Sequence, residues 1–163
     1  MINQGDIAPE FSLSDQYEKR RTLNDFLGYW FLLYFFNVGE VKFISEDCRS
    51  FACNYNLLKA SGFSVVGISL ASSASQLAFG ESHKLPYITL SDMSGEVSRR
   101  YGVLDNKYLS NGDLLVEDNS FLIDPTGLVA KVYLNKSPVK SVGDIKTDVR
   151  SLVSAFERLP VRQ

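Results

Sequence analysis

The chain has 163 residues, of which 45% are hydrophobic and 22% are charged, a composition typical of a folded globular domain and not of a disordered chain. Its formal net charge of −2 gives no general attraction for nucleic acid or anionic lipid. With two cysteines and one histidine, the chain lacks the residues for a disulfide-stapled secreted scaffold or a Cys/His zinc site.

No secretory signal is visible in the amino-terminal region, because no basic segment followed by a long apolar stretch is present. The longest apolar run, 30–36, has seven residues, whereas a membrane-spanning helix needs about 20. We therefore expect a single cytoplasmic domain over residues 1–163. We expect no metal or other cofactor, and neither nucleic acid nor membrane as a partner.

The first strong structural signal is the run from Trp30 to Phe36, which follows a turn predicted over 22–28. Every residue of this run is apolar, so both faces of a strand formed by it would be buried. The run therefore predicts a central strand that is covered by helices on both sides.

A helix is predicted next, over 45–60, followed by a second buried strand over 63–69. Ser45 is a suitable N-cap, and Glu46 and Asp47 favour the positive amino-terminal end of a helix. Apolar residues recur at helical spacing and mark its buried face. These residues are Cys48, Phe51, Ala52, Tyr55 and Leu58.

The second half of the chain continues the alternation and then changes to a hairpin and a final helix. The segment 105–118 contains a turn signal at Asn111-Gly112. Alternating strands and helices followed by a hairpin predict an α/β fold with a central mixed sheet flanked by helices. The predicted elements are a helix over 73–82, a strand over 86–90, a helix over 94–100, strands over 120–124 and 128–134 joined by Pro125-Thr126-Gly127, and an amphipathic helix over 142–156.

Several segments, in order, resemble the peroxiredoxins, in particular the Q-type (bacterioferritin comigratory protein) branch of the AhpC/TSA family. The resemblance covers roughly residues 3–158 and implies a thioredoxin-like fold. The matching segments are GDIAPEFSL (5–13), LNDFLGYW (23–30), GIS (67–69), LPYITLSDMSGEV (85–97), YGV (101–103) and FLIDPTG (121–127).

The resemblance also implies where the family's peroxide-reducing site would lie. The family carries a P-x-x-x-T-x-x-C motif after the first central strand and an arginine three residues before the F-L-I-D strand. The cysteine thiolate attacks the peroxide, while the threonine and arginine hold its oxygens. Counted without gaps from both flanks, the four positions are occupied by Asn37, Val41, Ile44 and Asp118. The sequence therefore predicts that thiol peroxidase activity has been lost.

Cys48 is the candidate catalytic residue if the activity survives. A shifted alignment would place Ser45 where the family has threonine, but Val41 and Asp118 would still replace the proline and the arginine. Glu46 and Asp47 oppose ionisation of the thiol. Cys53 lies about 140° around the helix from Cys48, too far for a disulfide without unwinding. A buried structural thiol is the alternative interpretation of Cys48.

Three functional hypotheses follow from these residues. The first is an inactive peroxiredoxin-like protein that retains a binding or regulatory role, for which the resemblance suggests a homodimer. The second is a thiol peroxidase that uses Cys48 and is reduced by thioredoxin or another thiol donor. The third is a remodelled site with an unrelated ligand. His83 is interpreted as a surface loop residue, and Asp92 and Gly95 as turn residues.

Overall fold

The computed structural model describes residues 2–38, 56, 59–60, 63–108, 114–116 and 119–134. Of the predicted helix over 45–60, the described residues 56, 59 and 60 are helical. The rest of that helix, the predicted helix over 142–156 and positions 41, 44, 48, 53 and 118 lie outside the described residues.

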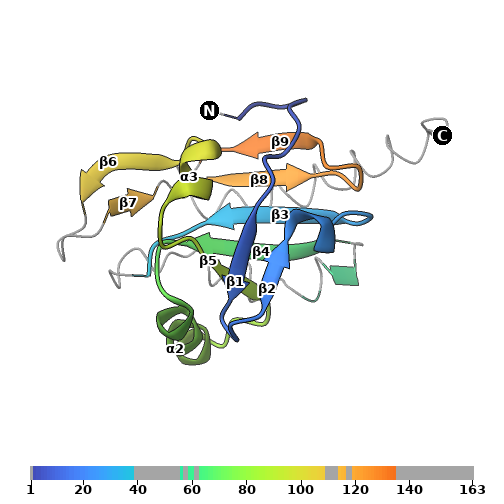
Figure 1. Cartoon of the computed structure of the whole chain (residues 1–163). Helices are drawn as coiled ribbons and strands as arrows, with labels where there is room; N and C mark the ends of the chain where they lie inside the picture. Colours follow the sequence, from blue (N-terminus) through green and yellow to red (C-terminus); the bar gives the residue numbers. More distant parts are fainter. Residues whose placement is uncertain are drawn as a thin grey trace.

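Seven strands of the described residues form one sheet, in the order β2-β1-β5-β4-β3-β8-β9 (Figure 1). Strand β3 pairs in parallel with β4, and β4 in parallel with β5, while β8 lies antiparallel on the other side of β3. The predicted mixed sheet is therefore confirmed. The strands are β1 (Ser12–Asp15), β2 (Arg20–Thr22), β3 (Trp30–Phe35), β4 (Phe63–Ser69), β5 (Ile88–Ser91), β8 (Ser120–Ile123) and β9 (Val129–Tyr133).

A second, two-stranded sheet is formed by β6 (Leu104–Tyr108) and β7 (Leu114–Val116), which pair antiparallel. It projects beside the main sheet in Figure 1. The described helical elements are the 3-10 turn η1 (Leu23–Asp25) and the helices α2 (Ser73–His83) and α3 (Glu96–Arg100).

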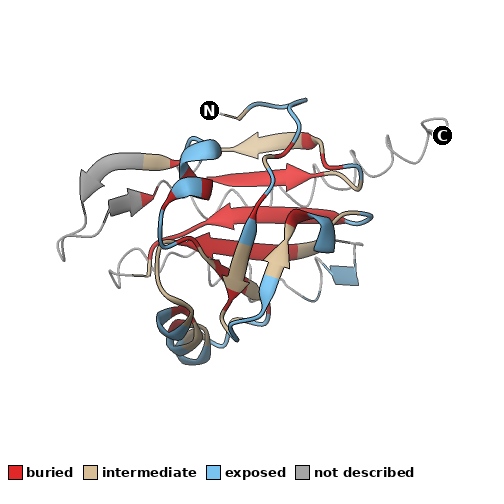
Figure 2. Ribbon diagram, viewed as in Figure 1, coloured by how far each residue is buried: buried red, intermediate tan, exposed pale blue. Residues whose placement is uncertain are grey.

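Strand β3 is buried along its whole length and separates two hydrophobic clusters (Figure 2). Because side chains alternate along a strand, Phe31, Leu33 and Phe35 belong to one cluster. Their neighbours Leu32, Tyr34 and Phe36 belong to the other. The prediction of a central strand covered on both faces is confirmed, and burial of each such side chain stabilises the fold by about 1.5–3 kcal/mol.

The two described helices contribute to opposite clusters. Phe79 of α2 stacks on Phe36, with ring centroids 5.6 Å apart, whereas Val97 of α3 packs in the cluster that contains Phe35. Each face of the sheet therefore has a helix against it, as the apolar pattern of β3 predicts.

Gly67 of β4 is required by the packing of one of these faces. A Cβ atom at this position would lie 2.9 Å from Phe36 and 3.3 Å from both Tyr34 and Thr89. A Cβ contact of 2.9 Å is shorter than real side chains make, so Phe36 can pack in its present position against β4 only because residue 67 has no side chain.

Two predicted elements begin two residues later than expected. The strand predicted over 86–90 begins at Ile88, because Pro86 has no N–H to donate to a strand partner. The helix predicted over 94–100 begins at Glu96, because Gly95 has a φ of 74° and acts as its N-cap. Gly95 is thus a turn residue, as predicted, with a conformation that favours glycine.

The β1–β2 hairpin was not predicted, because its strands are short and polar. Its turn is organised by Asp15, whose buried carboxylate accepts hydrogen bonds from the main-chain N–H groups of Tyr17 and Lys19 and from Arg21. Burial alone would raise the pKa of Asp15, but these hydrogen bonds and the positive charge of Arg21 outweigh it, so the pKa lies below its ordinary value.

Candidate functional site

The carboxyl end of β3 is where the sequence predicts the functional site, and three segments meet there. The N–H of Phe35 donates to the carbonyl of Asn119, and that of Phe36 donates to the carbonyl of Ile68. Ligands of open α/β sheets commonly bind at the carboxyl ends of the parallel strands. The position of Asn37, directly after β3, is therefore the described part of the candidate site.

Asn37 is buried and uses both ends of its side-chain amide within the protein. Its Nδ2 donates to the carbonyl of Val116 at 2.6 Å, and the N–H of Val116 donates to its Oδ1 at 3.0 Å. The side chain is 5% exposed. Asn37 therefore joins the end of β3 to β7, and its amide is directed at main-chain atoms of the protein and away from solvent.

An aromatic layer packs against the residues before Asn37. The ring of Tyr101 lies 5.4 Å from that of Phe35 and 5.2 Å from that of Phe121, centroid to centroid. The Tyr101 hydroxyl donates to the carbonyl of Pro9 at 2.8 Å. Burial raises the pKa of Tyr101 well above its ordinary value, so the phenol stays neutral and serves as a structural donor.

A buried polar network links the carboxyl ends of β4 and β5. Nε2 of Gln76 donates to Ser69 Oγ at 2.8 Å and to the carbonyl of Leu90 at 2.7 Å. The hydroxyl of Ser91 donates to the carbonyl of Ala71 at 2.6 Å. These contacts fix the amino-terminal half of α2 on the sheet, a role that the polar sequence of this helix did not reveal.

Asp92 is more than the turn residue that the sequence suggested. Its side chain is fully buried, and its carboxylate accepts hydrogen bonds from the N–H groups of Val97 and Ser98 and from the Ser98 hydroxyl. The carboxylate thus satisfies main-chain donors at the start of α3. This holds the loop after β5 in one position.

His83 is not a surface loop residue, which corrects the sequence interpretation. It is the last residue of α2, and its ring packs edge-on against Phe79 with 4.5 Å between centroids. The helix ends at Lys84, whose left-handed backbone angles prevent the helix from continuing. An aromatic contact on the inner side of the helix end explains the partial burial of this imidazole.

Of the predicted functional positions, Asn37 alone lies among the described residues. Val41, Ile44, Cys48 and Asp118 fall outside them, so their predicted roles stay predictions. Within the described ranges, no group of three or more His, Cys, Asp or Glu side chains is placed to hold a metal ion. No helix in those ranges is both long and apolar enough to cross a lipid bilayer.

Comparison with known proteins gives consistent similarities. The sequence model of the AhpC/TSA family matches residues 4–132. Chloroplastic peroxiredoxin Q of Arabidopsis thaliana is 33% identical over 147 residues, covering 88% of this chain and 65% of that protein. The Triticum aestivum counterpart is 29% identical over 152 residues, covering 93% of this chain and 68% of that protein. This chain thus spans about two thirds of the length of these relatives.

The structural comparison gives the same result. The crystal structure of peroxidoxin BcpB from Mycobacterium tuberculosis matches with a TM-score of 0.81 at 25% identity, covering 93% of this chain and 98% of that one. This likeness confirms the thioredoxin-like fold that the sequence resemblance implied.

Proposed function

The chain belongs to the AhpC/TSA family, the family of the peroxiredoxins, and from that premise we propose that it has lost peroxide reduction and keeps a binding or regulatory role. The proposal includes a homodimer and a cytoplasmic location. Reduction by thioredoxin or a similar thiol donor belongs only to the alternative, in which Cys48 acts as the nucleophile.

The observation that carries the proposal is the environment of Asn37. In the family motif this position is a proline that shields the reactive thiolate. Here both polar ends of the Asn37 amide are bonded to the main chain of Val116, and the side chain is buried. An arrangement of this kind holds residue 37 in the protein interior, which supports a structural role for this position.

The substitutions at the remaining family positions support the same proposal. Isoleucine at position 44 has no nucleophilic atom, and valine at position 41 has no hydroxyl to hold a peroxide oxygen. Aspartate at position 118 carries the opposite charge to the family's arginine. A thiolate beside a cation is the minimum requirement for attack on the peroxide bond.

The test is to measure hydrogen peroxide consumption by the purified protein with dithiothreitol and, separately, with a thioredoxin system as reductant. We expect a rate equal to that of the protein-free control, and the same rate for Cys48→Ser and Cys53→Ser. Catalytic consumption by the wild-type protein that disappears in Cys48→Ser alone would establish the alternative and refute the proposal.

A gain-of-function variant makes the test sharper. The combination Val41→Thr, Ile44→Cys and Asp118→Arg restores the family's reacting groups at the predicted positions, with Ile44→Ser in the same background as the matched control. We expect peroxide consumption that depends on the new cysteine.

Sedimentation velocity over a range of protein concentrations tests the homodimer, and cell fractionation tests the location.

A further inference from the structure

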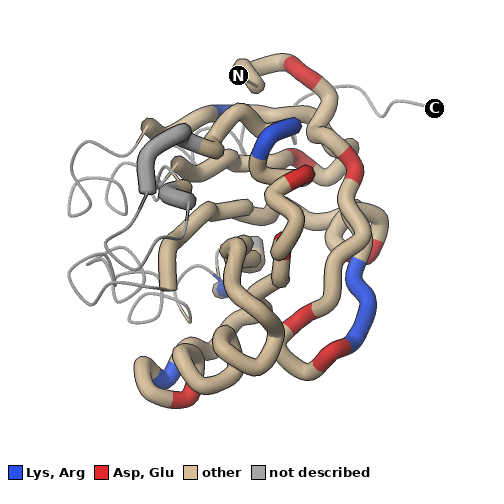
Figure 3. The backbone as a smooth tube through the Cα atoms, turned by 60° about the vertical axis from the view of Figure 1, so that its left-hand side comes forward, with Lys and Arg blue, Asp and Glu red and all other residues tan. Residues whose placement is uncertain are grey.

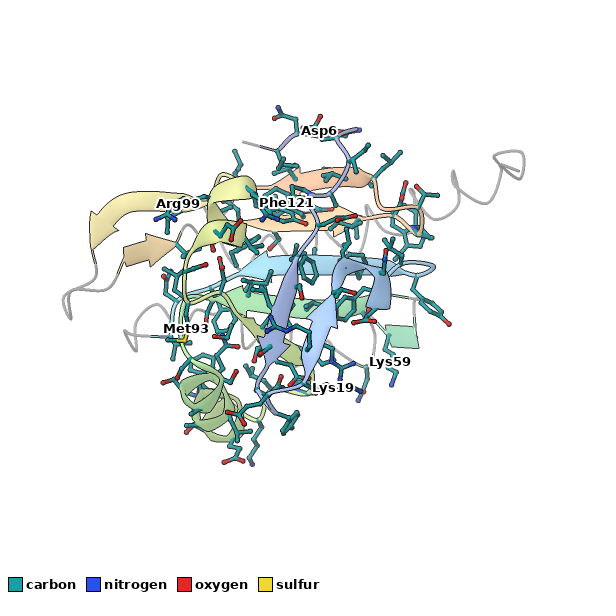
Figure 4. All side chains as sticks on the ribbon, in the orientation of Figure 1. Asp6, Lys19, Lys59, Met93, Arg99 and Phe121 are labelled. Carbon is teal, nitrogen blue, oxygen red and sulfur yellow. The ribbon has the colours of Figure 1, made fainter. Side chains whose placement is uncertain are left out.

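A groove of about 640 Å³ lies beside the carboxyl end of β5, away from Asn37. Its walls are the segment 10–13, the β2 side of the hairpin with η1, and the segment 91–97 together with Arg100. The volume is within the range of cavities that hold small ligands, about 300–1,000 Å³. Met93, on the loop between β5 and α3 (Figure 4), is 71% exposed and lies at its rim.

The groove exists because β1 and β5 pair over a short distance and then diverge. Their register contains the pairs Ser14–Ser91 and Asp15–Leu90. After Ser91, the Asp92 N–H donates to the carbonyl of Ser69, and its carboxylate caps α3. The chain therefore turns away from β1, and both walls of the groove are held by buried hydrogen bonds.

Two charged residues that line the groove have no ion-pair partner in the part of the chain that the structure describes. Arg20 makes one hydrogen bond, from Nη1 to the carbonyl of Ser12 at 2.9 Å. Glu10 also lines the groove, and none of the described cations pairs with its carboxylate. Figure 3 shows the mixture of positive and negative segments along this hairpin.

The neighbouring charges are already satisfied, which distinguishes them from this pair. Arg21 pairs with Asp15 at 3.0 Å, and Arg100 pairs with Glu96. A groove with one uncommitted cation and one uncommitted anion does not favour a simple anion. It matches a ligand that carries both charges.

The main-chain spacing between the two residues sets the scale of the ligand. Nη1 of Arg20 donates to the carbonyl of Ser12, two residues after Glu10, and two residues of extended chain span at most about 7 Å. The amino and carboxylate ends of an extended dipeptide are separated by the same length of backbone. Phe11, Leu13 and Val97 also line the groove and supply apolar surface.

We propose that this groove binds a short zwitterionic peptide, with its carboxylate on Arg20 and its ammonium group on Glu10. The hydroxyls of Ser12 and Thr22, which also line the groove, are available to hydrogen-bond the peptide unit. The proposal does not depend on the loss of peroxide reduction, because no residue of the groove belongs to the family's catalytic motif.

The experiment is a titration of the ¹⁵N-labelled protein with the dipeptide Gly-Leu, followed by two-dimensional amide spectra. We expect saturable shifts confined to residues 10–13, 20–24 and 91–100, with a dissociation constant on the order of 1 mM. N-acetyl-Gly-Leu and Gly-Leu-amide each lack one charge and are expected to bind about tenfold more weakly, which corresponds to about 1.4 kcal/mol.

Variants assign the two charges. Arg20→Gln and Glu10→Gln are expected to weaken binding of Gly-Leu about tenfold, whereas Lys19→Gln and Glu18→Gln, on the same hairpin but outside the groove, leave it unchanged. Arg20→Lys keeps the charge and retains partial binding. The same spectra report whether each variant is folded.

Each of the following outcomes would overturn the proposal. These are the absence of saturable shifts up to about ten times the expected dissociation constant, equal binding of Gly-Leu and its two blocked forms, and unchanged binding in both Arg20→Gln and Glu10→Gln. Equal binding of N-acetyl-Gly-Leu alone would identify an anion site and would equally refute a zwitterionic ligand.

Discussion

Two regions at the same edge of the sheet use polar residues in opposite ways. At the end of β3, the amide of Asn37 is buried and bonded at both ends to Val116. Beside the end of β5, Arg20 and Glu10 are exposed and lack ion-pair partners among the described residues. Polar groups whose partners lie inside the protein contribute to stability, whereas uncommitted groups are available to a ligand.

Buried carboxylates hold turns of the chain in place near the open groove. Asp92, which lines the groove, and Asp15 of β1 are both fully buried. Each accepts three hydrogen bonds that hold a turn in place. Buried carboxylates therefore hold these two turns, while the side chains of Arg20 and Glu10 stay exposed.

The largest effect is expected for Asp92→Ala. The substitution leaves the N–H groups of Val97 and Ser98 buried without their acceptor, so we expect the free energy of unfolding to fall by about 3–4 kcal/mol. Urea denaturation measures it. Ser94→Ala, on the exposed part of the same loop, is the control and should cost at most about 0.5 kcal/mol. Equal effects for the two variants would contradict the framework role of Asp92.

Asn37→Leu should have the next largest effect and tests the closed region directly. It removes two hydrogen bonds and leaves both main-chain polar groups of Val116 unsatisfied, so we expect a loss of about 2–3 kcal/mol in urea denaturation. Asn3→Leu, at an exposed position, should change stability by less than about 0.5 kcal/mol. A variant Asn37→Leu as stable as the wild type would contradict a stabilising role for the two hydrogen bonds between Asn37 and Val116.

Asp15→Asn is expected to cost about 1–2 kcal/mol near neutral pH, because a charged acceptor is replaced by a neutral one. Since the pKa of Asp15 is lowered in the folded protein, its contribution is fully present above its unfolded pKa of about 3.9. It is lost as the pH falls further, through the folded pKa. The difference in stability between wild type and variant should therefore shrink below about pH 4. A stability difference between wild type and Asp15→Asn that does not change with pH would contradict a lowered pKa for Asp15 in the folded protein.

The smallest effect is expected for Arg20→Gln, at most about 0.5 kcal/mol, because its guanidinium is exposed and makes one hydrogen bond. Arg21→Gln, one residue along, breaks the pair with a buried carboxylate and should cost about 1–2 kcal/mol. Thermal or urea denaturation of the two variants compares them under identical conditions. A cost for Arg20→Gln as large as that for Arg21→Gln would show that Arg20 is structural and not available to a ligand.

Much of the sheet was predictable because its signal is local. The apolar run at 30–36 and the run at 63–69 identify β3 and β4 from their hydrophobicity alone. Pro125-Thr126-Gly127 marks the turn between β8 and β9. The hairpin of β1 and β2 gave no such signal. Its short polar strands are stabilised by Asp15 and by pairing with β5, which lies far away in the sequence.

For the functional positions, the sequence alone predicts which residue types stand where the family has its motif. Asparagine at position 37 can be read directly from the chain, and so can the lack of a thiol at position 44. An asparagine is as compatible with an exposed loop as with a buried hydrogen bond, so its side chain's partner could not be inferred from the sequence.

Tertiary structure decided the roles of the polar residues, because hydrogen-bond partners and burial depend on contacts between distant segments. Asn37 meets Val116 only when β7 lies beside the end of β3, and Asp92 becomes a buried acceptor only when α3 folds back over it. The groove likewise arises from the divergence of β1 and β5. Composition and periodicity determined the core of this protein, while the arrangement of its strands determined which charges remain available.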